Sequence, residues 1–537
     1  MNLARSVADV LAEHVTFEVE CIDRMYCNVY VPRLQFARGL VGYVHHQLGL
    51  PVASTAPLGQ ITDRFTKSVR AFAAANDITW VDFAKGERKD DVMTKQLASF
   101  TAPEGVVFIG RAQEKTPMFR TEKHRHADGR CYPWIVRSTG VVNHFYFYCL
   151  DADFGPFFFK FGSYFPYNAK LCLNGHHWAQ RQAARAGIGF TAMDNAFAAV
   201  DDVAALQAIC DGLGPTQIYA LLEKWLKILP DPFSDADRDA GYRYQVSILQ
   251  AEFSLTQMLD TPITGRIFFE HVIRDNLDIG RADHVGLIFD RRIQRGRKRP
   301  TQSRFRTRVI TDGVTPSLHA DYKHTTVKQY HKEGRALRTE TTINDTRDFN
   351  IGKGLGNLPA LREIGFSANR RLLGVQRLDH NPIVGARELH HLTDPVITGT
   401  GSRIPGLPLG RPRSHALLSA LLTFRTQIAG FTNQDLRMIT AELRGLAPGE
   451  VTAGQATYDL RRLSSHGLIE RKPHSNRYRV TDRGLHTAML ITRVHDRLLP
   501  TGLARQTDPH AEHRLRTASI AYQRALDHLA EQNGLAA

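Results

Sequence analysis

The sequence contains few cysteines, and no two of them form a C-x-x-C pair. Only six are present among 537 residues: Cys21, Cys27, Cys131, Cys149, Cys172 and Cys210. A zinc ribbon needs closely paired cysteines, and a disulfide framework needs a much higher cysteine content. We therefore exclude both classes of protein and expect a reducing compartment.

Long apolar runs are also missing. The richest one, residues 141–161, is interrupted by Asp151, Asp153 and Lys160. A membrane-spanning helix needs about 20 apolar residues in succession. Residues 1–14 contain no apolar core of a signal peptide. We expect no membrane partner and a cytoplasmic, nucleoid-associated location.

Acidic residues are outnumbered by basic ones. The chain has 69 Lys and Arg residues against 54 Asp and Glu residues, which gives a formal net charge of +15. Such a balance favours an anionic partner, most often a nucleic acid. The alternative interpretation is a basic proteome in which solvated arginines are simply common.

The periodicity of apolar residues changes along the chain, which predicts an α+β multidomain protein. The runs ITWVDF and GVVFIG predict buried strands, as does LPVAST, and the spacing in 63–75 predicts a helix. NHFYFYCL and PFFFKF predict a hairpin. The expected parts are a mixed α/β domain at 1–200, a helical segment at 201–280, a basic β-rich segment at 281–375, a Gly/Pro-rich linker at 376–412, a module of helices and a hairpin at 413–500, and a C-terminal helix at 501–537.

Further predictions concern the middle of the chain. Residues 235–257 have apolar spacing near 3.6, which predicts a helix. Alternation with period two predicts strands in VGLIFDRRI, RFRTRVIT, TTVKQYH and ALRTETTIN. NGHHWAQRQAARAG predicts a helix with Asn174 as its N-cap, and another helix is expected at 358–373.

The module at 413–500 has a recognisable order of elements. Helices are expected at 414–424, 433–443, 453–466 and 482–496, with a hairpin formed by LIERK and RYRVT before the last helix. The string TYDLRRLSSHGLIERKPHSNRYRVTDRG closely resembles the recognition helix and wing of bacterial MarR-like regulators. The resemblance implies a winged helix-turn-helix that binds duplex DNA.

The third helix of this module would enter the major groove, which admits one α-helix, and the wing would contact the phosphate backbone. The side chains predicted to contact DNA are Gln455, Tyr458, Arg461 and Arg462 on the helix and Arg471, Lys472, Arg477 and Arg479 on the wing. The alternative is a winged helix that serves protein contacts only.

A second basic region lies between residues 290 and 308, which contain nine Lys or Arg residues and one acid. A loop of this charge density would neutralise several phosphates and make binding strongly salt-dependent. The predicted contacts are Arg295, Arg297, Lys298, Arg299, Arg304 and Arg306. The alternatives are a solvated loop or an oligomer contact, and a homodimer is among the expected partners.

A carboxylate flanked by arginine follows. Arg338 and Glu340 are two residues apart on a predicted strand, so both point to one face. The segment from Tyr322 to Asp345 resembles the "YDK…R-x-E" stretch of replication initiators of rolling-circle plasmids and phages. The resemblance implies that Glu340 binds a divalent metal and that a tyrosine, here Tyr330, attacks the phosphodiester. The chain departs from that pattern because it contains no His-hydrophobic-His pair, and the alternative is a structural cross-strand ion pair.

Polar groups within the aromatic region before residue 177 extend this hypothesis. Asp151, Asp153, His176 and Glu340 could together bind Mg²⁺ or Mn²⁺ and activate water for phosphodiester cleavage. His176 follows Asn174 at a helix start and could face an anion. The alternative is that the two aspartates are turn residues and that His176 is a satisfied side chain at a helix start.

Three functions follow from these patterns. The first is a metal-dependent DNA nuclease or nickase of the mobile-element or replication type, directed to duplex DNA by the winged helix. The second is a transcriptional regulator without enzymatic activity. The third is an RNA-binding or RNA-guided protein, because arginine-rich loops and exposed aromatic rings suit RNA or single-stranded DNA. The chain as a whole also resembles bacterial proteins of no assigned activity, which implies no chemistry.

Overall fold

The computed structural model divides the chain into two compact units, Met1–Asp379 (unit 1) and His380–Ala537 (unit 2). It describes residues 5–52, 54–84, 86–276, 279, 282–290, 307–312, 315–332, 335–399, 401–424, 430–447 and 449–507. Both helices and strands are abundant, so the mixed α and β composition expected from the sequence is confirmed. None of the helices in these ranges is long and apolar enough to cross a membrane.

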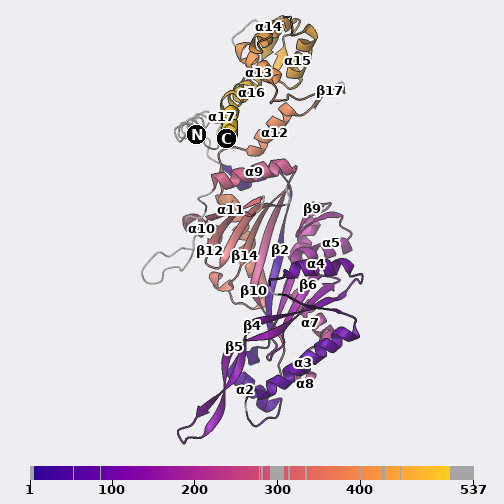
Figure 1. Ribbon diagram of the computed structural model, residues 1–537, viewed down its shortest axis with the longest axis vertical. Helices are drawn as coiled ribbons and strands as arrows, with labels where there is room; N and C mark the ends of the chain where they lie inside the picture. Colours follow the sequence, from indigo (N-terminus) through magenta and orange to yellow (C-terminus); the bar gives the residue numbers. More distant parts are fainter. Residues whose placement is uncertain are drawn as a thin grey trace. The chain divides into compact units, whose positions relative to one another are not determined.

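An 11-stranded sheet dominates unit 1 (Figure 1). All neighbouring strands are antiparallel except β3 and β4. In spatial order the strands are β11 (Thr307–Asp312), β12 (Thr315–Tyr322), β13 (Thr325–Lys332), β14 (Ala336–Ile343), β10 (Gln245–Leu259), β2 (Val15–Tyr30), β7 (Ala169–Asn174), β6 (Gly155–Gly162), β5 (Cys131–Asp151), β4 (Gly105–Arg125) and β3 (Thr79–Asp82).

This sheet corrects the predicted domain boundaries within unit 1. Strands from the predicted segments 1–200, 201–280 and 281–375 all pair in it, so these segments do not form separate domains. The joining strand is β10, which the sequence predicted as part of a helix. Its side chains alternate between an apolar face with Phe253 and Leu255 and a polar face with Ser254 and Thr256. Period two, not 3.6, is therefore the correct interpretation.

Two smaller predictions in unit 1 are also wrong. VGLIFDRRI was expected to be a strand, but Ala282–Phe289 form helix α10. Buried Val285, Ile288 and Phe289 lie three and four residues apart, which is the spacing of one helix face. The described residues of LPVAST form no strand.

Helices of unit 1 pack against the large sheet. Helix α11 (Leu358–Val375) packs against β10 and β14, where Phe366 lies 5.7 Å from Phe253 between ring centroids. The other helices of this unit are α1 (Val7–Leu11), α2 (Ala37–His46), α3 (Ala56–Ala75), α4 (Lys89–Ser99), α5 (Gly175–Arg185), α6 (Val203–Gly212), α7 (Pro215–Ile228), α8 (Asp235–Asp239) and α9 (Pro262–Asp275). Two short pairs, β8 (Phe190–Met193) with β9 (Ala196–Val200) and β1 (Arg5–Ser6) with β15 (Arg377–Leu378), complete it.

Unit 2 begins inside the predicted linker. Residues 376–412 contain helix α12 (Pro382–Thr393) and the pair β16 (Val396–Ile397) with β17 (Arg403–Ile404), so they are not a bare linker. Asn381 caps α12, since its side chain accepts hydrogen bonds from the backbone of Ile383 and Val384. An Asn followed by Pro is a helix-start signal that the glycines and prolines of this region obscured.

The remaining elements of unit 2 agree with the predicted order. They are α13 (Pro412–Phe424), α14 (Asn433–Leu443), α15 (Ala453–Ser465), the hairpin of β18 (Ile469–Arg471) and β19 (Tyr478–Val480), α16 (Asp482–Arg493) and α17 (Leu499–Thr507). Apolar side chains of α13, α14, α15 and α16 form one core. Most of the predicted C-terminal helix at 501–537 lies outside the described residues.

Candidate functional site

A β-bulge in β2 positions Asp23 near the centre of the sheet. Between its pairs with Phe253 and Ala251 of β10, β2 contains one residue more than β10. Asp23 and Arg24 share this place, and bulges of this kind redirect side chains. Asp23 is only 5% exposed, although a lone buried carboxylate is costly. It therefore needs a partner, and Arg338 supplies one.

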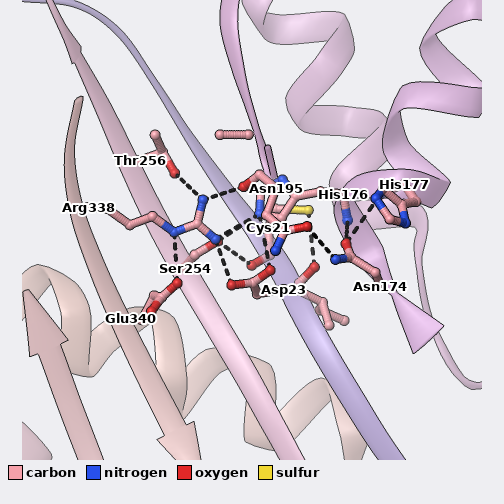
Figure 2. A network of polar contacts seen from close by, with 12 residues as sticks. Cys21, Asp23, Asn174, His176, His177, Asn195, Ser254, Thr256, Arg338 and Glu340 are labelled. Carbon is pink, nitrogen blue, oxygen red and sulfur yellow. Dashed lines mark hydrogen bonds and ion pairs between the residues drawn. The ribbon is translucent and has the colours of Figure 1, made fainter. Parts of the chain in front are cut away.

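Arg338 of β14 is fully buried and contacts groups from five different segments (Figure 2). Its guanidinium donates to Glu340 Oε1 from Nε (2.9 Å), to Asp23 Oδ2 from Nη2 (2.7 Å), to His176 Nε2 from Nη2 (3.2 Å), to Thr256 Oγ1 from Nη1 (3.3 Å) and to the Asn195 carbonyl oxygen from Nη1. We call these six residues the arginine network. An arginine with this many partners is held in one position.

The two carboxylates of the arginine network differ in their pKa. Burial raises the pKa of Asp23 to about 7, which Arg338 only partly opposes and the charge of Glu340 reinforces. Burial also acts on Glu340, but Arg338 holds the pKa of that carboxyl below its usual value. At neutral pH, Glu340 is thus the ionised partner of Arg338, and Asp23 titrates nearby.

His176 is a neutral member of the arginine network. Burial and the charge of Arg338 lower its pKa well below the usual value. Because Arg338 donates to Nε2, we assign the ring proton to Nδ1. Asn174 caps helix α5 as predicted, accepting from the backbone N–H groups of His176 and His177, so the imidazole is oriented by the helix start.

Tyr330 of β13 lies between Glu340 of the arginine network and Lys328 of the same strand. Its hydroxyl donates to Glu340 Oε1 over 3.0 Å, and burial together with the charge of Glu340 raises its pKa. The half-buried Lys328 places Nζ 4.2 Å from the centre of the Tyr330 ring. The predicted catalytic residues Glu340, Arg338, Tyr330 and His176 are therefore brought together.

The predicted metal ligands Asp151 and Asp153 belong to a different place, the turn between β5 and β6. Asp151 Oδ2 accepts from Trp225 Nε1 and Lys224 Nζ, both over 2.8 Å. Asp153 forms an ion pair with Arg185. These contacts agree with the alternative interpretation, in which both aspartates are turn residues.

No set of metal ligands surrounds Glu340 in the described part of the chain. There, the only three or more His, Cys, Asp or Glu donors within 4.8 Å of one another are His415, His495 and Asp496 of unit 2. Near Glu340, the guanidinium of Arg338 occupies the position between the carboxylates that a cation would need. Mg²⁺ or Mn²⁺ at Glu340 remains a prediction from sequence.

The sequence interpretation missed Asp23 and Asn195, which both bind Arg338. Asp23 had a detectable signal, since VECIDRMYCNV places an acid inside an apolar strand, where a charge requires a partner. Asn195 acts through its backbone carbonyl, so its side chain carried no signal. Its φ of +47° marks the tight turn between β8 and β9.

Helix α15 is the second candidate site. Thr452 caps it, accepting from the backbone N–H of Gln455 over 3.2 Å, while Gln455 Oε1 accepts from the backbone N–H of Thr452 over 3.1 Å. Behind this cap, the exposed side of the helix carries Gln455, Tyr458 and Arg461. Three of the four predicted helix contacts are thus available to a ligand.

Arg462 is the exception, and its prediction as a DNA contact is not supported by its position. Only 7% of it is exposed, its Nη2 lies 3.9 Å from Asp459 Oδ1, and its guanidinium lies over the ring of Tyr458. The residue lies on the inner side of α15, three residues after Asp459. The sequence argument relied on the number of arginines in this segment, which does not distinguish the buried Arg462 from the exposed Arg461.

The hairpin of β18 and β19 carries the other predicted contacts. Arg471, Arg477 and Arg479 are exposed, and Lys472 is half-buried. Arg479 pairs with Glu470 across the hairpin, and Arg471 bonds Asn476 in its turn. These surface contacts are weak and can be exchanged for phosphate oxygens. The predicted contacts in the basic loop, Arg295, Arg297, Lys298, Arg299, Arg304 and Arg306, lie outside the described residues.

Comparisons with known proteins assign neither site. Neither a family model, nor a curated protein, nor a solved structure matches the chain.

Proposed function

We propose that this protein binds duplex DNA through unit 2, in which α13, α14, α15, the β18–β19 hairpin and α16 form a winged helix. The observation that carries the proposal is the exposed side of α15. Its first turn has the small residues Ala453 and Gly454, so its backbone can approach a groove closely. Gln455, Tyr458 and Arg461 follow on the exposed side, with the arginines of the hairpin beyond the helix.

The chemistry of these side chains suits the major groove. An arginine can bond guanine O6 and N7 together, and a glutamine can bond adenine N6 and N7. The side-chain amide of Gln455 is only half engaged, because the cap uses Oε1 and leaves the amide nitrogen free to donate to a base. Arg471, Arg477 and Arg479 would contact phosphates and set the register.

The test is a binding-site selection from random duplexes, followed by titration of the selected duplex. We expect Arg461→Ala to weaken binding by about 5- to 150-fold, as for loss of one base contact of about 1–3 kcal/mol, and to relax specificity at one position. Arg493→Ala, an exposed arginine of α16, is the matched control and should leave affinity unchanged. No selected sequence, or equal losses for both variants, would refute the proposal.

We infer a second candidate activity for unit 1, cleavage of a phosphodiester with Tyr330 as nucleophile. The observation in its favour is the 3.0 Å hydrogen bond from Tyr330 to Glu340. As the Tyr330 oxygen bonds to phosphorus, the phenolic proton would pass to Glu340. The bond to the leaving strand oxygen would break, and that oxygen would take a proton from water.

This second activity has a direct readout, a protein–DNA adduct that survives denaturing electrophoresis. Supercoiled and single-stranded DNA are incubated with the protein alone, with Mg²⁺ and with Mn²⁺. We expect nicking and the adduct to disappear in Tyr330→Phe and to persist in Tyr219→Phe, an exposed tyrosine of α7. Intact DNA under all three conditions would leave the duplex-binding regulator as the better interpretation, and defined RNA co-purifying with the protein would favour the RNA-binding one.

A further inference from the structure

A cavity on the polar face of unit 1 has an unusual charge. It encloses about 710 Å³ and is lined by residues from β2, β4, β5, β6, β7 and β10 and from the loop at 347–354. Its lining includes six cationic side chains, Lys115, Arg137, Lys160, Lys170, Arg347 and Lys353, and a single carboxylate, Glu114. We call it the basic cavity.

The floor of the basic cavity brings two lysines together. Lys160 of β6 and Lys170 of β7 are direct cross-strand partners. Like charges in this position destabilise a sheet. The next partner beyond Lys170 is Asn28 of β2, whose side-chain oxygen accepts from Lys170 Nζ over 2.9 Å. Burial and the neighbouring Lys160 lower the pKa of Lys170 to about 8.

The one carboxylate of the basic cavity does not balance this charge. Glu114 is already engaged by Lys160 and by the hydroxyl of Tyr146, and Lys89 lies 3.3 Å from it. These contacts hold the pKa of Glu114 at about 2 despite its partial burial, so it is ionised and neutralises Lys160. Lys170 has no carboxylate of its own among the described residues.

At the rim of the basic cavity, cationic side chains also outnumber anionic ones. Lys353 forms an ion pair in which its Nζ lies 3.4 Å from Asp345 Oδ1. Lys115, Arg137 and Arg347 are exposed, and within the described ranges none of them forms an ion pair. Together with Lys170, they leave four cations around one space that form no ion pair in the described part of the chain. Such a set attracts a ligand that carries more than one negative charge.

Neutral groups of the lining add specificity. Asn28, Gln35 and Asn168 offer amides, and Tyr30 offers a ring. Gly352 and Gly354 bring backbone to the cavity, and no atom lies within 4 Å of the place that a Cβ of Gly354 would take. A volume of about 710 Å³ lies within the range of small-ligand sites. These groups suit a base and its sugar next to phosphates.

We propose that the basic cavity binds the phosphate groups of a nucleotide, with Lys170 at its floor and Arg137, Arg347 and Lys115 at its rim. Two sources carry this chemistry, a free nucleotide and a segment of single-stranded nucleic acid. This inference is independent of duplex binding by unit 2, because it involves none of the same residues.

The experiment titrates the full chain carrying Arg461→Ala, which removes a duplex contact of unit 2, with ATP and with an eight-residue oligothymidylate. Calorimetry at low salt measures both affinities. We expect at least one ligand to bind, and Lys170→Met to weaken that ligand at least tenfold. Lys67→Met, an exposed lysine of α3, is the matched control and should change nothing.

The two arms separate the sources. Tighter binding of ATP assigns a free nucleotide, and tighter binding of the oligonucleotide assigns a strand. Arg137→Ala, at an exposed rim position that cannot compromise the core, should weaken the same ligand. The proposal is overturned if neither ligand binds at millimolar concentration, or if both Lys170→Met and Arg137→Ala bind within twofold of the parent. Loss of duplex binding alone would affect only the proposal for unit 2.

Discussion

Two groups of charged side chains on the polar face of the large sheet differ in their charge balance. In the arginine network, one guanidinium is shared by Asp23 and Glu340, and each of its nitrogens donates to an acceptor. In the basic cavity, six cations surround one carboxylate. The comparison separates two uses of buried charge. A buried network whose charges are paired fixes the position of strands without a ligand, whereas an accessible group of unpaired cations favours the binding of an anion.

The largest expected effect comes from breaking the balanced group. Arg338→Ala leaves two buried carboxylates without a cation, so we expect a loss of about 3–5 kcal/mol in the free energy of unfolding. Urea denaturation followed by circular dichroism measures it. A loss below about 1 kcal/mol would mean that water replaces the guanidinium, and that the arginine network does not stabilise the fold.

A smaller effect distinguishes the two carboxylates. The low pKa of Glu340 means that its ionised form stabilises the fold above the unfolded pKa, and that this stability is lost as pH falls. Glu340→Gln should therefore cost about 1.5–3 kcal/mol at pH 7, the worth of a hydrogen bond to a charged group.

Asp23 should behave in the opposite sense. Its raised pKa means that the parent protein loses stability as pH rises from about 4, the unfolded value, to about 7. Asp23→Asn lacks this loss, so its stability relative to the parent should increase over that interval. Denaturation at pH 5, 6, 7 and 8 tests both variants, and parallel pH profiles for Asp23→Asn and the parent would contradict the assignment.

The smallest expected effect is in the basic cavity. Without ligand, Lys170→Met removes a repulsion between cross-strand lysines, so the free energy of unfolding should rise by about 0.2–1 kcal/mol. Lys160→Met should instead destabilise the protein, since it leaves the ionised Glu114 without its closest cation. Equal losses for both variants would show that Lys170 is a structural residue like Lys160.

The sequence predicted the elements of unit 2 better than those of unit 1. In α13 to α16, caps such as Thr452 and apolar spacing act locally, and a local pattern is legible in one sequence. The helix expected at 235–257 failed because β10 lies at the centre of the sheet, where both faces are largely buried and polar residues such as Ser254 appear inside. Pairing with distant strands decides whether such a segment forms a strand or a helix.

The candidate site was only partly predictable, because local strand geometry groups some of its residues and the pairing of distant strands groups the others. Arg338 and Glu340 share a face by strand geometry alone, and Tyr330 is paired directly with Arg338, which a hairpin register suggests. Asp23 lies 315 residues away in the chain. The lysines of the basic cavity are separated by long intervals and meet only through the order of strands, so no spacing rule could group them.

The β-bulge at Asp23 and Arg24 limits the changes in length that β2 can tolerate. It resets the phase of an alternating pattern: Cys21 before it shares a face with Tyr26 after it, since their partners Ser254 and Gln250 do so on β10. Deleting the extra residue of the bulge would turn the following half of β2 over, which would expose its apolar side chains and bury Asn28 and Tyr30 of the basic cavity. We therefore expect β2 to tolerate substitutions better than the insertion or deletion of a residue.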